Sequence, residues 1–192
     1  MRKLMLLVLL LLLCLPVAVA EEPLTYVNED YGLSFELLEG WEDASADGAT
    51  VFNGPADSFA MLAIGSTGIQ VNDEFIASFD AATVETWMRE SLVTEDFKIT
   101  ELSQYLFEST VIEDGRLYAY NLCAIAGEGF PEDFRMLHLQ YFFTDVNGIL
   151  GSVTLVIPAA DASQPILDWF DIIVIENIPM EAWDALFAKI ES

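Results

Sequence analysis

Residues Met136–Ile157 read MLHLQYFFTDVNGILGSVTLVI and indicate more about the fold than any other segment. Two apolar runs, Met136–Thr144 and Ile149–Ile157, are rich in β-branched and aromatic residues, which is typical of β-strands. Between them, Asn147 and Gly148 form a dipeptide that favours a tight β-hairpin turn. We therefore expect two neighbouring antiparallel strands joined by a short turn.

The segments before this hairpin repeat the pattern of short apolar runs separated by turn residues. Runs of this kind, bounded by Gly, Pro, Asn or Asp, predict strands. The further predicted strands are Leu24–Asn28, Leu33–Leu38, Thr50–Asn53, Ser58–Ile64, Ile99–Phe107, Thr110–Ile112 and Leu117–Ile125.

Other stretches have the spacing of amphipathic helices. From Ala81, apolar residues recur three and four positions apart, and Asp80 stands where an N-cap belongs. A second helix opens at Ser163, and Pro179 separates it from a short final helix. This order of elements predicts an α+β fold, a mainly antiparallel β-sheet covered by helices. We expect that domain over residues 21–178 and a C-terminal amphipathic helix over residues 179–192.

Residues 1–20 have the features of a secretory signal peptide. Two basic residues precede an apolar run, and an Ala-x-Ala motif ends at Ala20. We expect cleavage between Ala20 and Glu21, and hence an extracytoplasmic protein that is secreted or held in the cell envelope. The apolar run is shorter than the ~20 residues of a membrane-spanning helix. Lipid attachment at Cys14 is the weaker alternative, because Leu13 stands where a bacterial lipoprotein has a small residue.

The chain is strongly acidic, with 32 acidic and 7 basic residues among 192 and a net charge of −25. Loss of residues 1–20 removes two basic residues and leaves 172 residues with a net charge of −27. A surface with this much negative charge repels phosphate backbones and anionic lipid headgroups. We therefore expect the protein to bind neither nucleic acid nor anionic membranes. With 54% hydrophobic residues, the chain is too apolar for an acidic disordered tail.

The first two predicted strands resemble the opening of a known family. The residues that carry the resemblance are Tyr26, Asn28, Tyr31, Gly32, Leu33, Ser34, Phe35, Gly40 and Trp41. They are similar to the start of the PsbP/Mog1 superfamily, which includes bacterial PsbP-like exported proteins of unknown function. Leu38 departs from the pattern, because the family has a proline there. The resemblance implies a PsbP/Mog1-like α/β/α sandwich and an accessory or binding role, and it carries over no functional residue.

One loop resembles half of a calcium site. Asp43, Ser45 and Asp47 place oxygen-bearing side chains at alternate positions before Gly48, as in the first half of an EF-hand loop. Position twelve, where such a loop has a bidentate Glu, is Gly54. The segment predicts either weak calcium binding at Asp43, Ser45 and Asp47 or a solvated turn. We expect no other cofactor.

We find no motif typical of an enzyme and expect no catalytic residue. His138 is the only histidine and Cys123 is the only thiol of the mature chain, so an intramolecular disulfide is not expected. A cysteine hydrolase needs these two side chains together. Both lie inside predicted strands, so we expect packed residues instead. The 32 acids offer many carboxylate pairs for glycoside hydrolysis and favour none of them.

Two functional hypotheses follow. The favoured one is a non-catalytic binding or accessory module with a protein partner. It predicts an exposed apolar patch on this chain that includes Trp169, Phe170 or Trp183. The helical spacing of these aromatics favours simple core packing as the alternative. The second hypothesis is an extracytoplasmic hydrolase with paired carboxylates, which expects a deep pocket holding two acids of raised pKa. The oligomeric state is left open.

Overall fold

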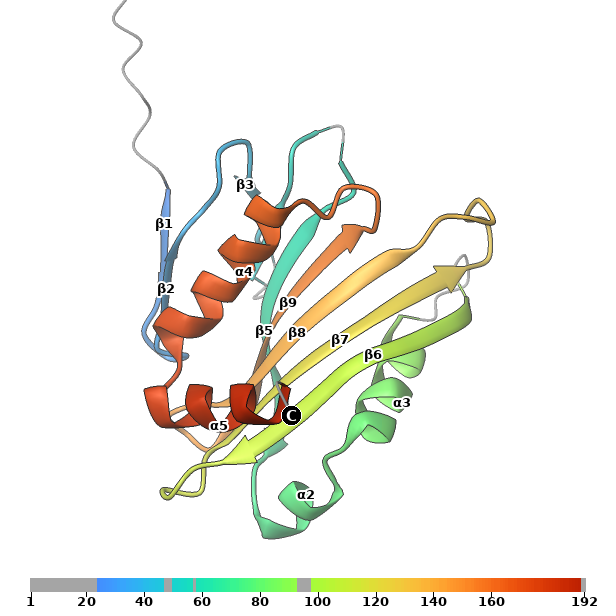
Figure 1. Cartoon of the computed structure of the whole chain (residues 1–192). Coiled ribbons are helices and arrows are strands. Elements are labelled where there is room, and N and C mark those ends of the chain that lie inside the picture. The colour runs from blue at the N-terminus through green and yellow to red at the C-terminus, as the bar shows by residue number, and fades with distance from the viewer. Residues whose placement is uncertain (1–23, 47–49, 57, 93–97, 191–192) are drawn as a thin grey trace, which may run out of the picture.

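The computed structural model of the chain describes residues 24–46, 50–56, 58–92 and 98–190 (Figure 1). The predicted signal peptide with its cleavage site between Ala20 and Glu21 lies outside these residues, and so do Cys14 and Asp47. In the part of the chain that is described, no helix combines the length and the apolar character needed to cross a membrane.

A seven-stranded sheet with the order β3-β4-β5-β9-β8-β7-β6 forms the centre of the molecule. Every neighbouring pair in it is antiparallel, as expected from the sequence. Its strands are β3 (Glu42–Asp43), β4 (Thr50–Asn53), β5 (Met61–Gln70), β6 (Ile99–Val111), β7 (Leu117–Gly127), β8 (Met136–Thr144) and β9 (Ile149–Pro158).

Helices cover both faces of this sheet, which confirms the predicted α/β/α sandwich (Figure 1). One face carries α4 (Gln164–Asn177) and α5 (Met180–Ile190), and α5 packs on β6 and β7. The other face carries α2 (Asp73–Ser78) and α3 (Ala81–Ser91), which connect β5 in the middle of the sheet to β6 at its edge. A separate hairpin of β1 (Thr25–Asn28) and β2 (Leu33–Glu36) packs beside α4.

The β8–β9 hairpin lies where the sequence predicts it, with β9 ending one residue later, at Pro158. Gly148 has φ of 77°, a left-handed conformation that glycine adopts without strain. The carboxylate of Asp145 accepts hydrogen bonds from the backbone N–H groups of Asn147 and Ile149, both at 2.8 Å. Asp145 is therefore buried but satisfied, and it holds the register in which Thr144 pairs with Leu150.

The alternation of side chains along each strand produces two separate cores. On β8, Leu139, Tyr141 and Phe143 belong to the core beneath α4 and α5, whereas Met136 and Phe142 belong to the core beneath α2 and α3. The pleat sends successive side chains to opposite faces, so one apolar strand supplies both cores.

Trp169 joins α4 to the first hairpin and to the core. Its ring centroid lies 4.9 Å from that of Trp41, and its indole N–H donates to the carbonyl oxygen of Glu36 at 2.7 Å. Trp169 is 6% exposed and Phe170 is fully buried. The expectation that these two belong to an exposed patch is therefore wrong, because the apolar side of α4 faces the sheet, and the core-packing alternative holds for both.

The structure differs from the predicted elements in several places. The strand β3 is not predicted, and β5 covers Met61–Gln70 where the sequence predicts Ser58–Ile64. The helix α2 is absent from the sequence prediction, because its six residues are too few to show a helical period; Asn72 caps it by accepting from the Phe75 N–H. The two strands predicted at Ile99–Phe107 and Thr110–Ile112 are one strand, β6, which is irregular between Gln104 and Leu106. Hydrogen bonding to β7 keeps the polar residues between the two predicted strands in extended conformation.

Candidate functional site

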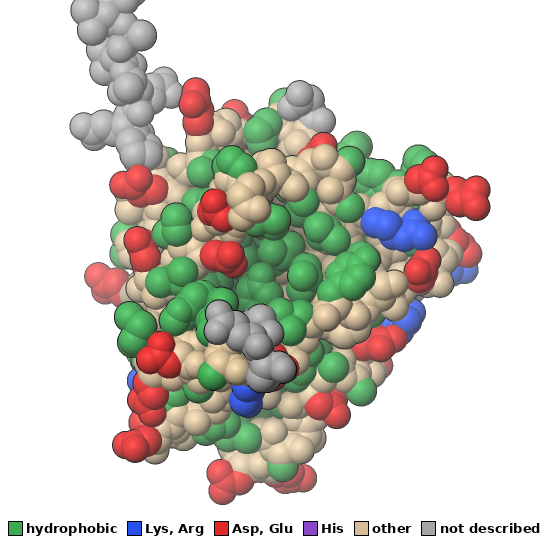
Figure 2. Space-filling view, viewed as in Figure 1, with side chains coloured by type: hydrophobic (Ala, Val, Ile, Leu, Met, Phe, Trp, Pro, Cys, Tyr) green, Lys and Arg blue, Asp and Glu red, His purple; other side chains and the backbone are tan. Residues whose placement is uncertain are grey.

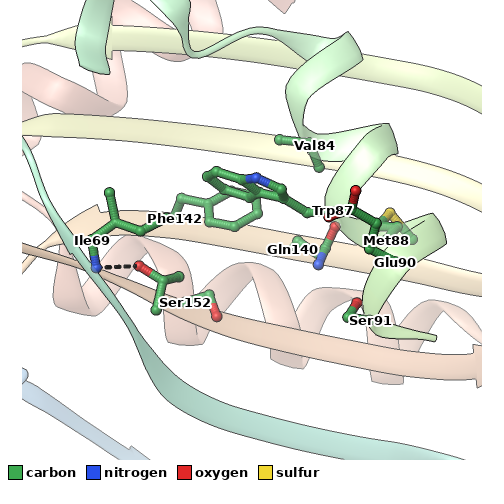
Figure 3. Close-up of a pocket in the computed structure, with 10 residues that line it drawn as sticks. Ile69, Val84, Trp87, Met88, Glu90, Ser91, Gln140, Phe142 and Ser152 are labelled. Carbon is green, nitrogen blue, oxygen red and sulfur yellow. Dashed lines mark hydrogen bonds between the residues drawn. The ribbon is translucent and has the colours of Figure 1, made fainter. Parts of the chain in front are cut away.

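A groove of about 480 Å³ lies between α3 and the sheet, and we call it the α3 groove (Figure 3). Its apolar walls are formed by Ile69, Val84, Trp87, Met88 and Phe142. Its polar lining consists of Thr67, Glu90, Ser91, Gln140 and Ser152. This size and this mostly apolar lining with a few polar groups are typical of sites for small ligands.

Packing holds the walls of the α3 groove in place. Val84 and Met88 are buried beneath α3, whose N-cap Asp80 accepts from the Thr83 N–H at 2.8 Å. The Trp87 ring stacks on Phe75 with an interplanar angle of 10°. On the opposite wall, the hydroxyl of Thr67 in the irregular part of β5 donates to the Leu150 carbonyl oxygen.

A row of three side-chain amides crosses the sheet beneath α3 and ends in this groove. Nε2 of Gln104 donates to Oδ1 of Asn121 at 2.6 Å, and Nδ2 of Asn121 donates to Oε1 of Gln140 at 2.8 Å. Asn121 is fully buried, whereas Gln140 is half-buried and lines the groove. The row therefore connects edge strand β6 to the groove through a core that is otherwise apolar.

Cys123 and His138 are cross-strand partners of β7 and β8, so they lie side by side on the α3 face of the sheet. Burial raises the pKa of the Cys123 thiol to about 11 and lowers that of His138 to about 4. A cysteine nucleophile needs the opposite shifts, because the thiolate is stabilised by a protonated neighbour. The thiol instead contacts the sulfur of Met88 at 3.5 Å. Cys123 and His138 are both buried, packed residues, as the sequence predicts.

The predicted calcium loop is described in part. Oδ1 of Asp43 accepts from the Ser45 N–H at 2.8 Å, and the Ser45 hydroxyl bonds to the backbone of Val51. A side chain at Gly54 would place its Cβ 2.8 Å from Cβ of Ala60, so close packing explains why a carboxylate is missing at position twelve. Within the described residues no three acidic, His or Cys side chains are grouped to hold a metal, and calcium binding with Asp47 stays a prediction.

A second cavity, of about 310 Å³, lies between the β1–β2 turn, the β8–β9 hairpin and the end of α4. Two of its charged groups already have partners: Asp145 caps the hairpin turn, and Arg116 pairs with Asp114 at 2.6 Å. A further charged group in its lining, Glu176, is exposed. Among the acids, Asp171 has a pKa raised by burial and by the neighbouring Asp168, but it lines neither cavity.

The face with α4 and α5 has an apolar hollow where the helices leave the sheet uncovered (Figure 2). On this face, half-buried apolar side chains from the sheet and from both helices pack against the core. We use the name apolar hollow for the surface of six of them: Tyr120, Leu122, Leu137, Leu167, Trp183 and Phe187. Of the three aromatics that the sequence offered for an exposed patch, Trp183 is the one that is half-buried rather than buried, with its ring against Phe187.

Asp171 places a charged group beside this hollow. It lies on the same side of α4 as Leu167, one turn away. Its carboxylate also acts on Tyr120: burial and, secondly, Asp171 raise the pKa of that phenol. A half-buried carboxylate therefore sits among the apolar side chains of the hollow.

The sequence does not predict the α3 groove or the amide row. Both depend on strand register, which brings Gln140 opposite Asn121 and Gln104 opposite Cys123. The one indication in the sequence is that amide side chains occur in runs that are otherwise apolar, because buried polar groups need partners.

No protein-family model matches the sequence, and no curated protein matches it. Among solved structures, the fold is similar to the solution structure of cyanobacterial PsbP (CyanoP) from Synechocystis sp. PCC 6803. The TM-score is 0.54 at 18% sequence identity, over 84% of this chain and 94% of that chain. The chain thus has a PsbP-like fold, which is the fold that the resemblance in its first two strands implies.

Proposed function

We propose that this is an exported, non-catalytic accessory protein that binds another protein through the apolar hollow. The observation that carries the proposal is the hollow itself, an apolar surface between the helices (Figure 2). Trp183 and Phe187 of α5 are half-buried, and their rings are in contact. Aromatic side chains that keep part of their surface exposed are enriched at protein interfaces. The PsbP-like fold is compatible with such a role.

The charge of the hollow indicates the kind of partner. Asp171 places a carboxylate among apolar groups, in a domain with a net charge of −27 after cleavage. Burial already makes the charged form of Asp171 unfavourable, so a basic side chain brought next to it would be held strongly. The surface that fits is therefore apolar with a Lys or Arg at its centre, and nucleic acid and anionic membranes are excluded by repulsion.

We propose a non-catalytic role because the two candidate reactive side chains, Cys123 and His138, are in unreactive protonation states. The neutral thiol of Cys123 and the neutral imidazole of His138 are buried, and burial moves the pKa of each away from the range in which it would act.

Charge reversal at Asp171 tests the proposal, with Glu176→Lys as its matched control. Glu176 is an exposed acid on the same helix that lines the second cavity instead of the hollow. The mature protein, beginning at Glu21, is used to capture partners from the extracytoplasmic fraction of its source. We expect Asp171→Lys to reduce capture of a discrete protein at least about tenfold, and Glu176→Lys to leave it unchanged. Equal capture by both variants would contradict binding at the hollow.

A further inference from the structure

The α3 groove lies on the face of the sheet opposite the apolar hollow and has a chemistry of its own. The amide row supplies the groove with a hydrogen-bond donor at Gln140, and the orientation of this amide is fixed by the contacts of Gln104 at the opposite end of the row. Nε2 of Gln104 lies 2.5 Å from the carbonyl oxygen of Leu106 and 3.1 Å from that of Leu122. Carbonyl oxygens only accept, so the nitrogen of this amide must face them.

This orientation passes along the row from amide to amide. With the nitrogen of Gln104 fixed, the oxygen of Asn121 must face it, and Nδ2 of Asn121 must face Gln140. Oε1 of Gln140 is then the acceptor of that bond, and its Nε2 points away from Asn121. Among the described residues, no group accepts a hydrogen bond from this nitrogen, and Figure 3 shows the Gln140 amide between Phe142 and α3 in the groove.

The rest of the lining restricts what can bind beside Gln140. The walls at Trp87, Met88 and Phe142 are apolar, so a bound molecule must be largely hydrocarbon. Among the residues that the structure describes, the lining contains no basic side chain, and Glu90 lies at the end of α3 beside the groove. The apolar walls disfavour the burial of any charged group, and an anionic ligand would in addition meet that carboxylate and the negative surface without a compensating cation. A neutral ligand therefore fits the groove best.

We propose that the α3 groove binds a neutral, mainly hydrocarbon small molecule whose carbonyl oxygen accepts a hydrogen bond from Nε2 of Gln140. A carbonyl oxygen satisfies the free donor and offers no proton that would need a second acceptor. Because each amide in the row donates to the next, the row polarises the donor at its end and strengthens that bond. Binding here is separate from protein docking at the hollow.

A matched pair of fluorescent probes tests the proposal. The first is 6-propionyl-2-dimethylaminonaphthalene, which is neutral and has one ketone, and the second is 2-dimethylaminonaphthalene, which lacks the ketone. We expect the ketone probe to bind the mature protein more tightly than its parent. Gln140→Leu removes the donor and should weaken binding of the ketone probe about tenfold, with little effect on the parent.

Two further measurements keep the test decisive. Gln140→Glu still accepts from Asn121 but places an acceptor in the groove, so it should weaken the ketone probe equally even where Gln140→Leu folds poorly. With methyl-labelled methionine, the NMR signal of Met88 in the groove should shift on binding, whereas that of exposed Met180 should not. Equal binding of both probes, insensitivity to both variants, or an unmoved Met88 signal would overturn the proposal.

Discussion

Gly151 shows how one missing side chain allows the packing of the central strands. A Cβ at this position would lie 2.6 Å from Cζ of Phe143, its cross-strand partner. Phe143 is itself buried and packs against Tyr141 and Tyr31, so its ring has little room to move. The glycine is therefore required by contact, not by backbone conformation.

Gly151→Ala should lower the free energy of unfolding by about 1–3 kcal/mol, because the Phe143 ring must shift in a filled core. Gly65→Ala on the adjacent strand β5 is the control, since a Cβ there meets nothing within 4 Å. Urea unfolding of the two variants and the parent protein measures the difference. Equal losses in both variants would show that β-strand glycines matter here for another reason.

His138 makes stability depend on pH in a direction set by burial. Its pKa is lowered to about 4 in the fold, against 6.5 for an unburied imidazole. The unfolded chain therefore binds a proton at a pH where the folded chain does not. This contribution to stability is complete above pH 6.5 and decreases as the pH falls to about 4, by roughly 3 kcal/mol.

His138→Leu should remove that part of the pH dependence. Unfolding free energies of the variant and the parent protein between pH 7 and pH 4 give the comparison, and carboxyl groups common to both cancel. Asp171 acts in the opposite sense, because its raised pKa makes protonation on acidification favour the fold. Parallel pH profiles for the two proteins would contradict a neutral, buried His138.

The roles of single residues were predictable where local rules decide them. Gly148 in the hairpin turn and Asp80 at the start of α3 follow from the sequence alone. The pairing of Cys123 with His138 and the amide row depend on strand register, which no local pattern specifies. The burial of Trp169 depends on which side of α4 meets the sheet.

At the scale of elements, the helices α3 and α4 begin in different ways. The Asp80 side chain accepts from the backbone of Thr83, whereas Ser163 at the start of α4 makes no capping bond through its side chain. The helix α4 is held instead by Pro165 in its first turn and by its buried apolar side.

Asp80→Ala should therefore lower the thermal stability of the protein measurably, and Ser163→Ala should have little effect. Thermal unfolding of both variants at one pH provides the measurement. Because α3 forms a wall of the α3 groove, probe binding should weaken in the first variant only. The reverse order of stabilities would refute the assignment of the two caps.

Strong periodicity and turn chemistry made most elements predictable. The strands β8 and β9 and the helix α3 appear nearly where the residue pattern places them. The helix α2 was missed, because its six residues leave no buried side chain to mark a face. The continuity of β6 was also missed, since hydrogen bonding to β7 overrides its polar interruption.

At the scale of the whole molecule, one antiparallel sheet has two different apolar surfaces. The face with α4 and α5 has the broad apolar hollow with Asp171, and the face with α3 has a groove ending in the Gln140 amide. The class of this fold was predictable from the order of elements, and its three layers were implied by the family resemblance. The surfaces were not, because they depend on where the helices lie across the sheet.

The most direct test of protein binding at the hollow is site-specific photo-crosslinking in the native extracytoplasmic fraction. Benzoylphenylalanine replaces Trp183 in the hollow or, as the control, Phe59, which is 76% exposed on the β4–β5 connection. We predict one discrete protein adduct from position 183, none of the same mass from position 59, and loss of the adduct when Asp171→Lys is added. No adduct from position 183, or the same adducts from both positions, would contradict the proposed function.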